Sequence, residues 1–162
     1  TQLLQLGAIS LGEYSKFIFK HFERTGTNIS QEAIDFVYEI VGGYTWYMQM
    51  LLNRLYSSSE KNIEQTTARL LLSDILQENE TTYQTYCKLI TEKQRALLKA
   101  IALEKEIKEP MAAEFIAKHK LGSTSTVSLS IKTLLKKELL LENNGKYIVY
   151  DRFFSLWLEK NG

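Results

Sequence analysis

The stretch Lys118-His119-Lys120-Leu121-Gly122-Ser123-Thr124-Ser125-Thr126-Val127 determines how the second half of the chain folds. The glycine and serine in its middle are typical of the end of one helix and the cap of the next. Before it, a helix is predicted over residues 110–119, with Pro110, the only proline, in its first turn. After it, four apolar residues recur at helical spacing, Val127, Ile131, Leu134 and Leu135. Helix, short turn and helix predict a helix-turn-helix.

The flanking segments enlarge this unit. The segment that begins at Thr91 has the apolar spacing of another helix, through Gln94, Leu97, Leu98, Ile101 and Ala102. Further on, Asn143-Asn144-Gly145-Lys146 precedes the β-branched and aromatic run Tyr147-Ile148-Val149-Tyr150, and Asn-Gly is the strongest short hairpin signal. Three helices and a hairpin predict a winged helix over residues 91–162. The closing run 151–158 predicts a helix, and its aromatic residues are interpreted with those of the hairpin as core packing, not as a stacking platform: Tyr147, Tyr150, Phe153, Phe154 and Trp157.

The first half of the chain, residues 1–90, is predicted to form short helices. Ser10 and Glu13 have capping-box spacing, which predicts a helix from Leu11 to about Arg24. Its expected buried stripe is Tyr14, Phe17, Ile18 and Phe22. Ser30 is the expected cap of a second helix, which Gly42-Gly43 ends.

A third helix is expected to begin at Thr45 as its cap and to stop at the serines 57–59. Its expected face is Tyr47, Met50, Leu51 and Leu55. Two more helices, from residue 66 or 67 to 77 and from 81 to 89, are predicted to bridge the halves. The fold class predicted is therefore mainly α, a helical bundle followed by a winged helix-turn-helix with a small hairpin.

The amino-acid composition excludes several classes of protein. The 162 residues are 44% hydrophobic and 24% charged, which excludes a disordered or collagen-like chain. No run approaches the roughly 18 to 20 apolar residues of a membrane span. The single cysteine, Cys87, forms neither an internal disulfide nor a multi-cysteine metal site. We therefore expect a soluble, cytoplasmic protein without membrane contact, and Thr1 in place of methionine suggests a fragment.

Charge is unevenly distributed along the chain. Residues 1–90 hold 7 Lys and Arg against 10 Asp and Glu, net −3, whereas residues 91–162 hold 13 against 9, net +4. A basic second half favours a part that meets phosphates, but this excess is small beside that of dedicated DNA-binding domains.

Motifs for independent catalysis are absent from the sequence. It has no G-x-x-x-x-G-K-[ST], G-x-G-x-x-G, H-E-x-x-H, C-x-x-C or G-x-S-x-G. The acid pairs Glu104 and Glu106, and Glu78 and Glu80, are two residues apart, so on a helix they point to different sides. We expect this fragment to carry no catalytic and no metal site.

Three segments together resemble the C-terminal half of prokaryotic, archaeal-type AAA+ ATPases of the STAND-related group. They are Ile40-Val41-Gly42-Gly43-Tyr44-Thr45-Trp46-Tyr47-Met48-Gln49, residues 121–127 and residues 147–158. The resemblance implies a lid-like helical subdomain over residues 1–65, connecting helices over 66–90 and a winged helix over 91–162. It also implies a parent ATPase whose N-terminal core carries the phosphate loop and binds ATP and Mg²⁺, with this region as the lid.

In that family the Gly-Gly segment lies near the nucleotide, which assigns five residues of this chain to that place: Gly42, Gly43, Tyr44, Thr45 and Trp46. The chain departs from the family by Thr45 where proline is usual and by the lack of an arginine at the start of that helix. Without the resemblance, Gly42-Gly43 is a simple helix end, with Trp46 and Tyr47 buried.

The winged helix has its own candidate contacts for DNA or a protein partner: Ser123, Thr124, Ser125, Thr126, Ser128, Lys132, Lys136 and Lys146, with Lys137 as a further phosphate contact. The expected recognition helix lacks Arg, Asn and Gln, the side chains suited to reading bases. Two alternatives to the ATPase region stay open, a stand-alone winged-helix DNA-binding regulator and a helical interaction adapter.

Overall fold

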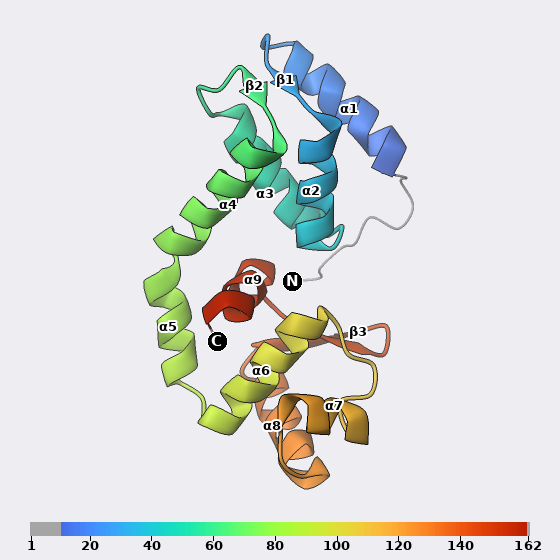
Figure 1. Cartoon of the computed structure of the whole chain (residues 1–162), viewed down its shortest axis with the longest axis vertical. Helices are drawn as coiled ribbons and strands as arrows, with labels where there is room; N and C mark the ends of the chain where they lie inside the picture. Colours follow the sequence, from blue (N-terminus) through green and yellow to red (C-terminus); the bar gives the residue numbers. More distant parts are fainter. Residues whose placement is uncertain (1–10, 162) are drawn as a thin grey trace. The chain divides into compact units, whose positions relative to one another are not determined.

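The computed structural model describes residues 11–161 and divides the chain into two compact units, with the boundary between Gln77 and Glu78 (Figure 1). The first unit contains α1 Leu11–Glu23, β1 Asn28–Ile29, α2 Gln31–Val41, α3 Thr45–Tyr56, β2 Asn62–Ile63 and most of α4 Gln65–Glu78. The second contains α5 Glu80–Lys88, α6 Glu92–Glu104, α7 Ala113–His119, α8 Thr124–Lys136, β3 Leu140–Asn143, β4 Lys146–Val149 and α9 Arg152–Asn161. The mainly α fold class is confirmed.

The helix ends of the first unit follow local signals. Ser30 caps α2 as predicted, since its hydroxyl accepts from the Ala33 amide at 3.1 Å. The prediction that Thr45 caps α3 is wrong: Tyr44 is the cap residue, without a side-chain capping bond, and Thr45 is the first helical residue. Helix α1 ends at Glu23. The predicted pair of Ser10 with Glu13 lies in part outside the described residues, because Ser10 is not described.

The buried face of α1 differs from its predicted stripe. Ile18 and Phe22 are buried, Tyr14 is half-buried, and Phe17 is 64% exposed, so its predicted burial is wrong. The reason is that α1 turns Ser15, Ile18 and Phe22, spaced three and four residues apart, toward the core. Phe17 lies outside that stripe and stacks on His21 with 6.2 Å between ring centroids.

A two-residue parallel sheet, absent from the sequence predictions, closes the first unit. Asn28 and Ile29 of β1 pair with Asn62 and Ile63 of β2. The Asn28 amide donates to the Lys61 carbonyl at 2.8 Å, and both isoleucines are buried. The sheet therefore fixes the connection after α1 to the connection after α3.

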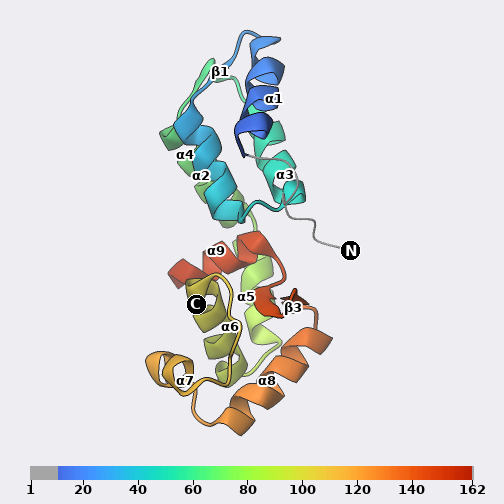
Figure 2. The ribbon, with the colours of Figure 1, turned by 90° about the vertical axis from the view of Figure 1, so that its right-hand side faces the viewer.

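Helix α6 is the centre of the second unit. Figures 1 and 2 show it between α9 on one side and α7 with α8 on the other, and it packs against all three and against β4. Its Leu97, Leu98 and Ile101 are fully buried together with Leu134 of α8. The aromatic residues of α9 are core as predicted: Phe154 is 1% exposed, and α5 reaches it through a ring contact.

The hairpin forms as predicted. β3 and β4 are antiparallel in the register Leu140 to Val149, and the two-residue loop has φ of 53° at Asn144 and 76° at Gly145. Positive φ at both loop residues matches the right-handed twist of the strands. Ile107 adds a bridge to the edge, since it exchanges two backbone hydrogen bonds with Tyr147, at 3.0 and 2.8 Å.

The predicted helix 110–119 is shorter than expected. Pro110 lies in a turn that the Ala112 amide closes on the Glu109 carbonyl at 3.0 Å, and α7 begins only at Ala113. Proline suits the second position of such a turn as well as a first helical turn, so its presence alone did not distinguish the two. No helix within residues 11–161 combines the length and apolar character needed to cross a bilayer.

Candidate functional site

The turn between α7 and α8 is built from backbone geometry and a serine cap. Lys120 adopts a left-handed conformation with φ of 53°, and the Leu121 amide donates to the Ile116 carbonyl at 3.0 Å. The Ser123 hydroxyl accepts from the Thr126 amide at 3.2 Å and lies 3.0 Å from the Thr126 hydroxyl. Two of the predicted contact residues, Ser123 and Thr126, therefore start helix α8.

One side of α8 faces solvent. Ser125, Leu129, Lys132 and Lys136 recur at spacings of four, three and four residues, so they form one stripe along the helix. Ser128 lies beside it and is half-buried. We call these five residues the α8 face. Helix α8 contains no acidic residue, and Lys132 and Lys136 make no ion pair within the described part of the chain.

Leu129 is the residue of this face that the sequence analysis missed. Its side chain is 65% exposed in the middle of α8. The available signal was its position four residues after Ser125 and three before Lys132, both expected on the outer face. An apolar residue on a mostly polar stripe was assigned no role because leucine is usually counted toward the core.

Three other lysines of the second unit have a partner within the domain. Lys146, a predicted contact residue at the start of β4, makes an ion pair with Glu106 at 2.7 Å. Lys105 pairs with Glu159 at 2.9 Å. Lys137 donates to the Leu89 carbonyl at 2.7 Å. Lys105 and Lys146 are therefore paired within the domain, whereas Lys132 and Lys136 have no ion pair among the described residues.

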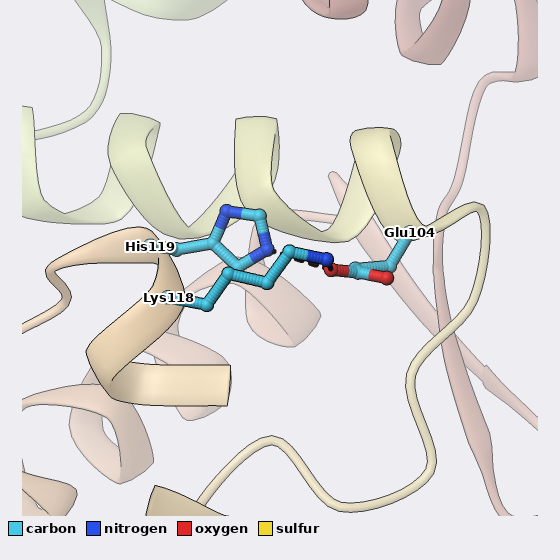
Figure 3. A network of polar contacts seen from close by, with 3 residues as sticks. All are labelled: Glu104, Lys118 and His119. Carbon is cyan, nitrogen blue, oxygen red and sulfur yellow. Dashed lines mark hydrogen bonds and ion pairs between the residues drawn. The ribbon is translucent and has the colours of Figure 1, made fainter. Parts of the chain in front are cut away.

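Glu104 holds the helix-turn-helix to α6 through the contacts drawn in Figure 3. Its Oε1 accepts from Lys118 Nζ at 2.5 Å and lies 2.8 Å from His119 Nε2. The hydrogen bond from Lys118 lowers the pKa of Glu104 most, and the hydrogen bond with His119 lowers it further. The His119 ring is half-buried with its centroid 5.0 Å from that of Phe115. This cluster joins the end of α6 to the end of α7.

Asp151 fixes the start of α9 through backbone hydrogen bonds. One carboxylate oxygen accepts from the Phe153 amide at 2.9 Å and from the Phe154 amide at 3.2 Å. Burial raises the pKa of Asp151, and the bonds from Phe154 and Phe153 oppose that rise. The residue therefore caps the helix that supplies the aromatic core.

In the first unit, Gly42 and Gly43 both have structural reasons to be glycine. Their φ angles are 65° and 72°, in the left-handed region. The Gly43 amide donates to the Tyr38 carbonyl at 3.1 Å, which closes the end of α2. A Cβ on Gly43 would lie 3.2 Å from the Tyr38 ring. The junction is thus both left-handed and crowded.

The five residues assigned to the nucleotide neighbourhood lie together at this junction. Gly43 and Tyr44 are buried, Gly42 and Thr45 are half-buried, and Trp46 is 59% exposed. Burial of Trp46, which the simpler interpretation required, is therefore wrong. Its indole contacts the buried Tyr47 edge-on with 4.8 Å between centroids. The start of α3 thus presents an aromatic ring to solvent beside an end without a side-chain cap.

The second unit is hollowed between its helices. A cavity of about 410 Å³ is lined by residues of α5, α6 and α9, including Glu80, Arg95 and Trp157. Burial raises the pKa of Cys87 on its wall, and Arg95 partly offsets that effect. Another cavity, of about 340 Å³, lies between α6 and α7 and includes Leu103 and His119. Within the described residues, no cluster of His, Cys, Asp and Glu could hold a metal.

Comparison with known proteins supports the geometry of the second unit. Residues 81–160 match the family model described as a probable winged helix domain. Searches of curated proteins and of solved structures gave no match for the chain. The matched range covers helices α6, α7 and α8, the β3–β4 hairpin and the closing helix α9 up to residue 160. Residues 81–160 therefore form a winged helix domain that contains a helix-turn-helix.

Proposed function

We propose that this chain is the lid and winged-helix region of an AAA+/STAND-like ATPase, in which the winged helix engages a partner as the nucleotide pocket opens and closes. The observation that supports it best is the junction from Gly42 to Trp46, which precedes the winged helix in the order of that family. The phosphate loop, ATP, Mg²⁺ and hydrolysis belong to an N-terminal core in the parent, and this region contributes no catalytic residue.

The junction suits a nucleotide-proximal role on physical grounds. The first amides of a helix lack intrahelical partners and favour anions, and α3 is 12 residues long without a side-chain cap. The exposed Trp46 ring offers a flat apolar surface to a base. Gly43 keeps the backbone free of a Cβ where it approaches Tyr38. In this proposal Gly42, Gly43, Tyr44, Thr45 and Trp46 line the lid side of the pocket.

The first test is the gene sequence upstream of Thr1. The proposal requires a strand followed by G-x-x-x-x-G-K-[ST] within roughly 250 residues, the upper range of a domain. A start codon directly before Thr1 would overturn it. In the full-length product, nucleotide should change the fluorescence of Trp46, measured as the difference between the wild-type protein and its Trp46→Phe variant.

A second readout is the Gly43→Val variant of the full-length product. The branched side chain crowds Tyr38 and displaces the start of α3, so nucleotide affinity or turnover should fall. Gly26→Ala is the control, since Gly26 has a similar φ of 71° in the same unit and a Cβ there would meet no atom within 4 Å. Unchanged affinity and turnover in a folded Gly43→Val protein would remove the junction from the pocket.

The second candidate is a stand-alone winged-helix DNA-binding regulator. It is favoured by the hydroxyls of α8, exposed at Thr124 and Ser125 and half-buried at Ser128, and by Lys132 and Lys136, which have no ion pair among the described residues; these five residues are the proposed contacts. Binding to duplex DNA would weaken steeply as salt rises from about 50 mM to 200 mM, and Lys132→Glu would lower affinity and the salt slope. A binding constant that does not respond to salt would exclude this candidate.

A further inference from the structure

We infer that the α8 face binds an acidic, amphipathic protein segment whose apolar side receives Leu129. The inference rests on the proposed function in one respect, that the winged helix engages a partner. It names the chemistry of that partner and the residue that anchors it.

The apolar part of the argument is the position of Leu129. A side chain 65% exposed at the centre of the face gains most by burial against another apolar surface. In the major groove of DNA the same side chain would meet base edges, where only the thymine methyl is apolar and the polar groups would lose water partners. A protein segment with apolar side chains at helical spacing provides the better match.

The charge around Leu129 selects an acidic segment. Lys132 and Lys136 lie on the same stripe, one turn apart, and α8 carries no acidic residue to neutralise them. An apolar centre beside two unpaired cations is complementary to an apolar side chain followed by carboxylates.

The hairpin argues against duplex DNA as the occupant. Its loop has only two residues, the exposed Glu142 is acidic, and Lys146 is paired with Glu106. Lys118, at the end of α7, is paired with Glu104. Binding to the DNA backbone strengthens with the number of cations free to contact phosphates, and Lys118 and Lys146, which lie outside α8, are already held by carboxylates.

The test is selection of a displayed library of helical peptides, randomised on one face, against the whole 162-residue chain. Peptides that bind Leu129→Asp are removed first. The retained peptides are expected to combine apolar residues at three- and four-residue spacing with an excess of Asp and Glu. Individual peptides should lose roughly 10- to 30-fold in affinity for Leu129→Ala, as at an interface anchor.

Matched variants separate this result from general adhesion. Leu70→Ala removes an apolar side chain of similar exposure, 68%, in the first unit and should leave peptide affinity unchanged. The double variant Lys132→Glu, Lys136→Glu should select basic peptides in place of acidic ones. Because all four positions are exposed, the variants should keep the wild-type circular dichroism spectrum.

Several results would overturn the inference. They are a selection that yields no peptide dependent on Leu129, retained peptides without an acidic excess, or tighter binding of random-sequence duplex DNA that Lys132→Glu abolishes. The upstream sequence and the nucleotide titration test the ATPase parentage by other readouts. If peptides bind but the gene upstream of Thr1 encodes no phosphate loop, this inference stands and the proposed parent is rejected.

Discussion

The two units both attach a two-stranded sheet to helices, but they assemble it differently. In the second unit, β3 and β4 are neighbours in sequence and a two-residue loop fixes their register. In the first, β1 and β2 are 34 residues apart and parallel, so the chain between them must cross over through helices α2 and α3. A sheet whose strands are adjacent in sequence is specified by its own loop residues. A sheet whose strands are far apart in sequence depends on the packing of the helices between them.

The largest expected effect comes from removing the core residue of the distant sheet. Ile63→Ala deletes a side chain that is 1% exposed in β2, and large-to-small core changes of this kind cost about 2 to 4 kcal/mol. We expect the first unit to lose stability and the second to keep it. Segment-resolved hydrogen exchange measures both in one experiment.

Ile148→Ala is the matched variant in the hairpin, where Ile148 is 5% exposed in β4. It should reduce the protection of β3, β4 and α6 and leave the first unit unchanged. Equal loss of protection across both units in either variant would show that they unfold together, and would end the comparison.

The same contrast explains what the sequence could predict. Asn144-Gly145 and the Ser30 cap act within a few residues, and both predictions are confirmed. The β1–β2 pair was missed because two residues per strand leave no periodicity to detect. Burial of Phe17 was predicted wrongly because helical spacing identifies a stripe only when apolar residues are confined to one side, and α1 has them on several.

The candidate sites were predicted less completely than the fold. The residues around Gly42 and along α8 were identified by type, but Ser123 and Lys146 proved to be engaged within the domain. Leu129 was overlooked because leucine is usually counted toward the core, although its spacing from Ser125 and Lys132 places it on the outer face. Composition also does not predict which charged side chains pair across the domain, such as Lys146 with Glu106, because these pairs form only in the folded structure.

A smaller effect should distinguish the glycines of the two units. Gly43 and Gly145 have similar φ angles, 72° and 76°, but only Gly43 is crowded, by Tyr38. Replacement of either by alanine should cost about 1 kcal/mol for the left-handed backbone. Gly43→Ala should cost about 1 kcal/mol more, since the Tyr38 ring must move. Urea unfolding of both variants measures the difference in the free energy of unfolding. When Gly43→Ala is made in a Tyr38→Ala protein, the additional cost of crowding should be absent.

Equal costs for Gly43→Ala and Gly145→Ala would show that Tyr38 yields without penalty. In that case the junction would be restrained only by its backbone angles, as the hairpin loop is.

The cap of α9 should have an effect of about 1 kcal/mol, specific to the second unit. Asp151→Ala removes the acceptor of the Phe153 and Phe154 amides, and loss of a helix cap typically costs about 1 kcal/mol. Asp151→Asn retains an acceptor and should stay within about 0.5 kcal/mol of wild type. Chemical unfolding monitored through Trp157, in a Trp46→Phe background, reports this unit.

The pH dependence of Asp151 provides the control. Because burial raises its pKa, the folded state holds the proton more tightly than the unfolded chain does, so the contribution of Asp151 to stability falls as pH rises from 3.8 through the raised value. Asp151→Asn has no titrating carboxyl at this position. Its free energy of unfolding should therefore rise relative to that of wild type as pH increases from 3.8 through the raised pKa. A constant difference between the two proteins across it would refute the effect of burial on this carboxyl.

The smallest expected effect concerns the contact of α6 with α7. Glu104→Gln keeps the shape of the side chain and removes the charge that faces Lys118 and His119, and ion pairs of this kind contribute about 0.5 kcal/mol. Since the folded state lowers the pKa of Glu104, the unfolded chain binds its proton more tightly. The stabilisation is therefore complete above the ordinary value of 4.5 and is lost as pH falls through the lowered pKa.

Urea unfolding from about pH 7 downward should show the difference between wild type and Glu104→Gln shrinking to zero once Glu104 is protonated in both states. Glu106→Gln is the comparison, because Glu106 is half-exposed and pairs with Lys146 alone, so its replacement should change stability less. If the two variants lost equal stability at every pH, the shared oxygen of Glu104 would add nothing beyond a single surface pair. The helix-turn-helix would then be held to α6 by its apolar contacts.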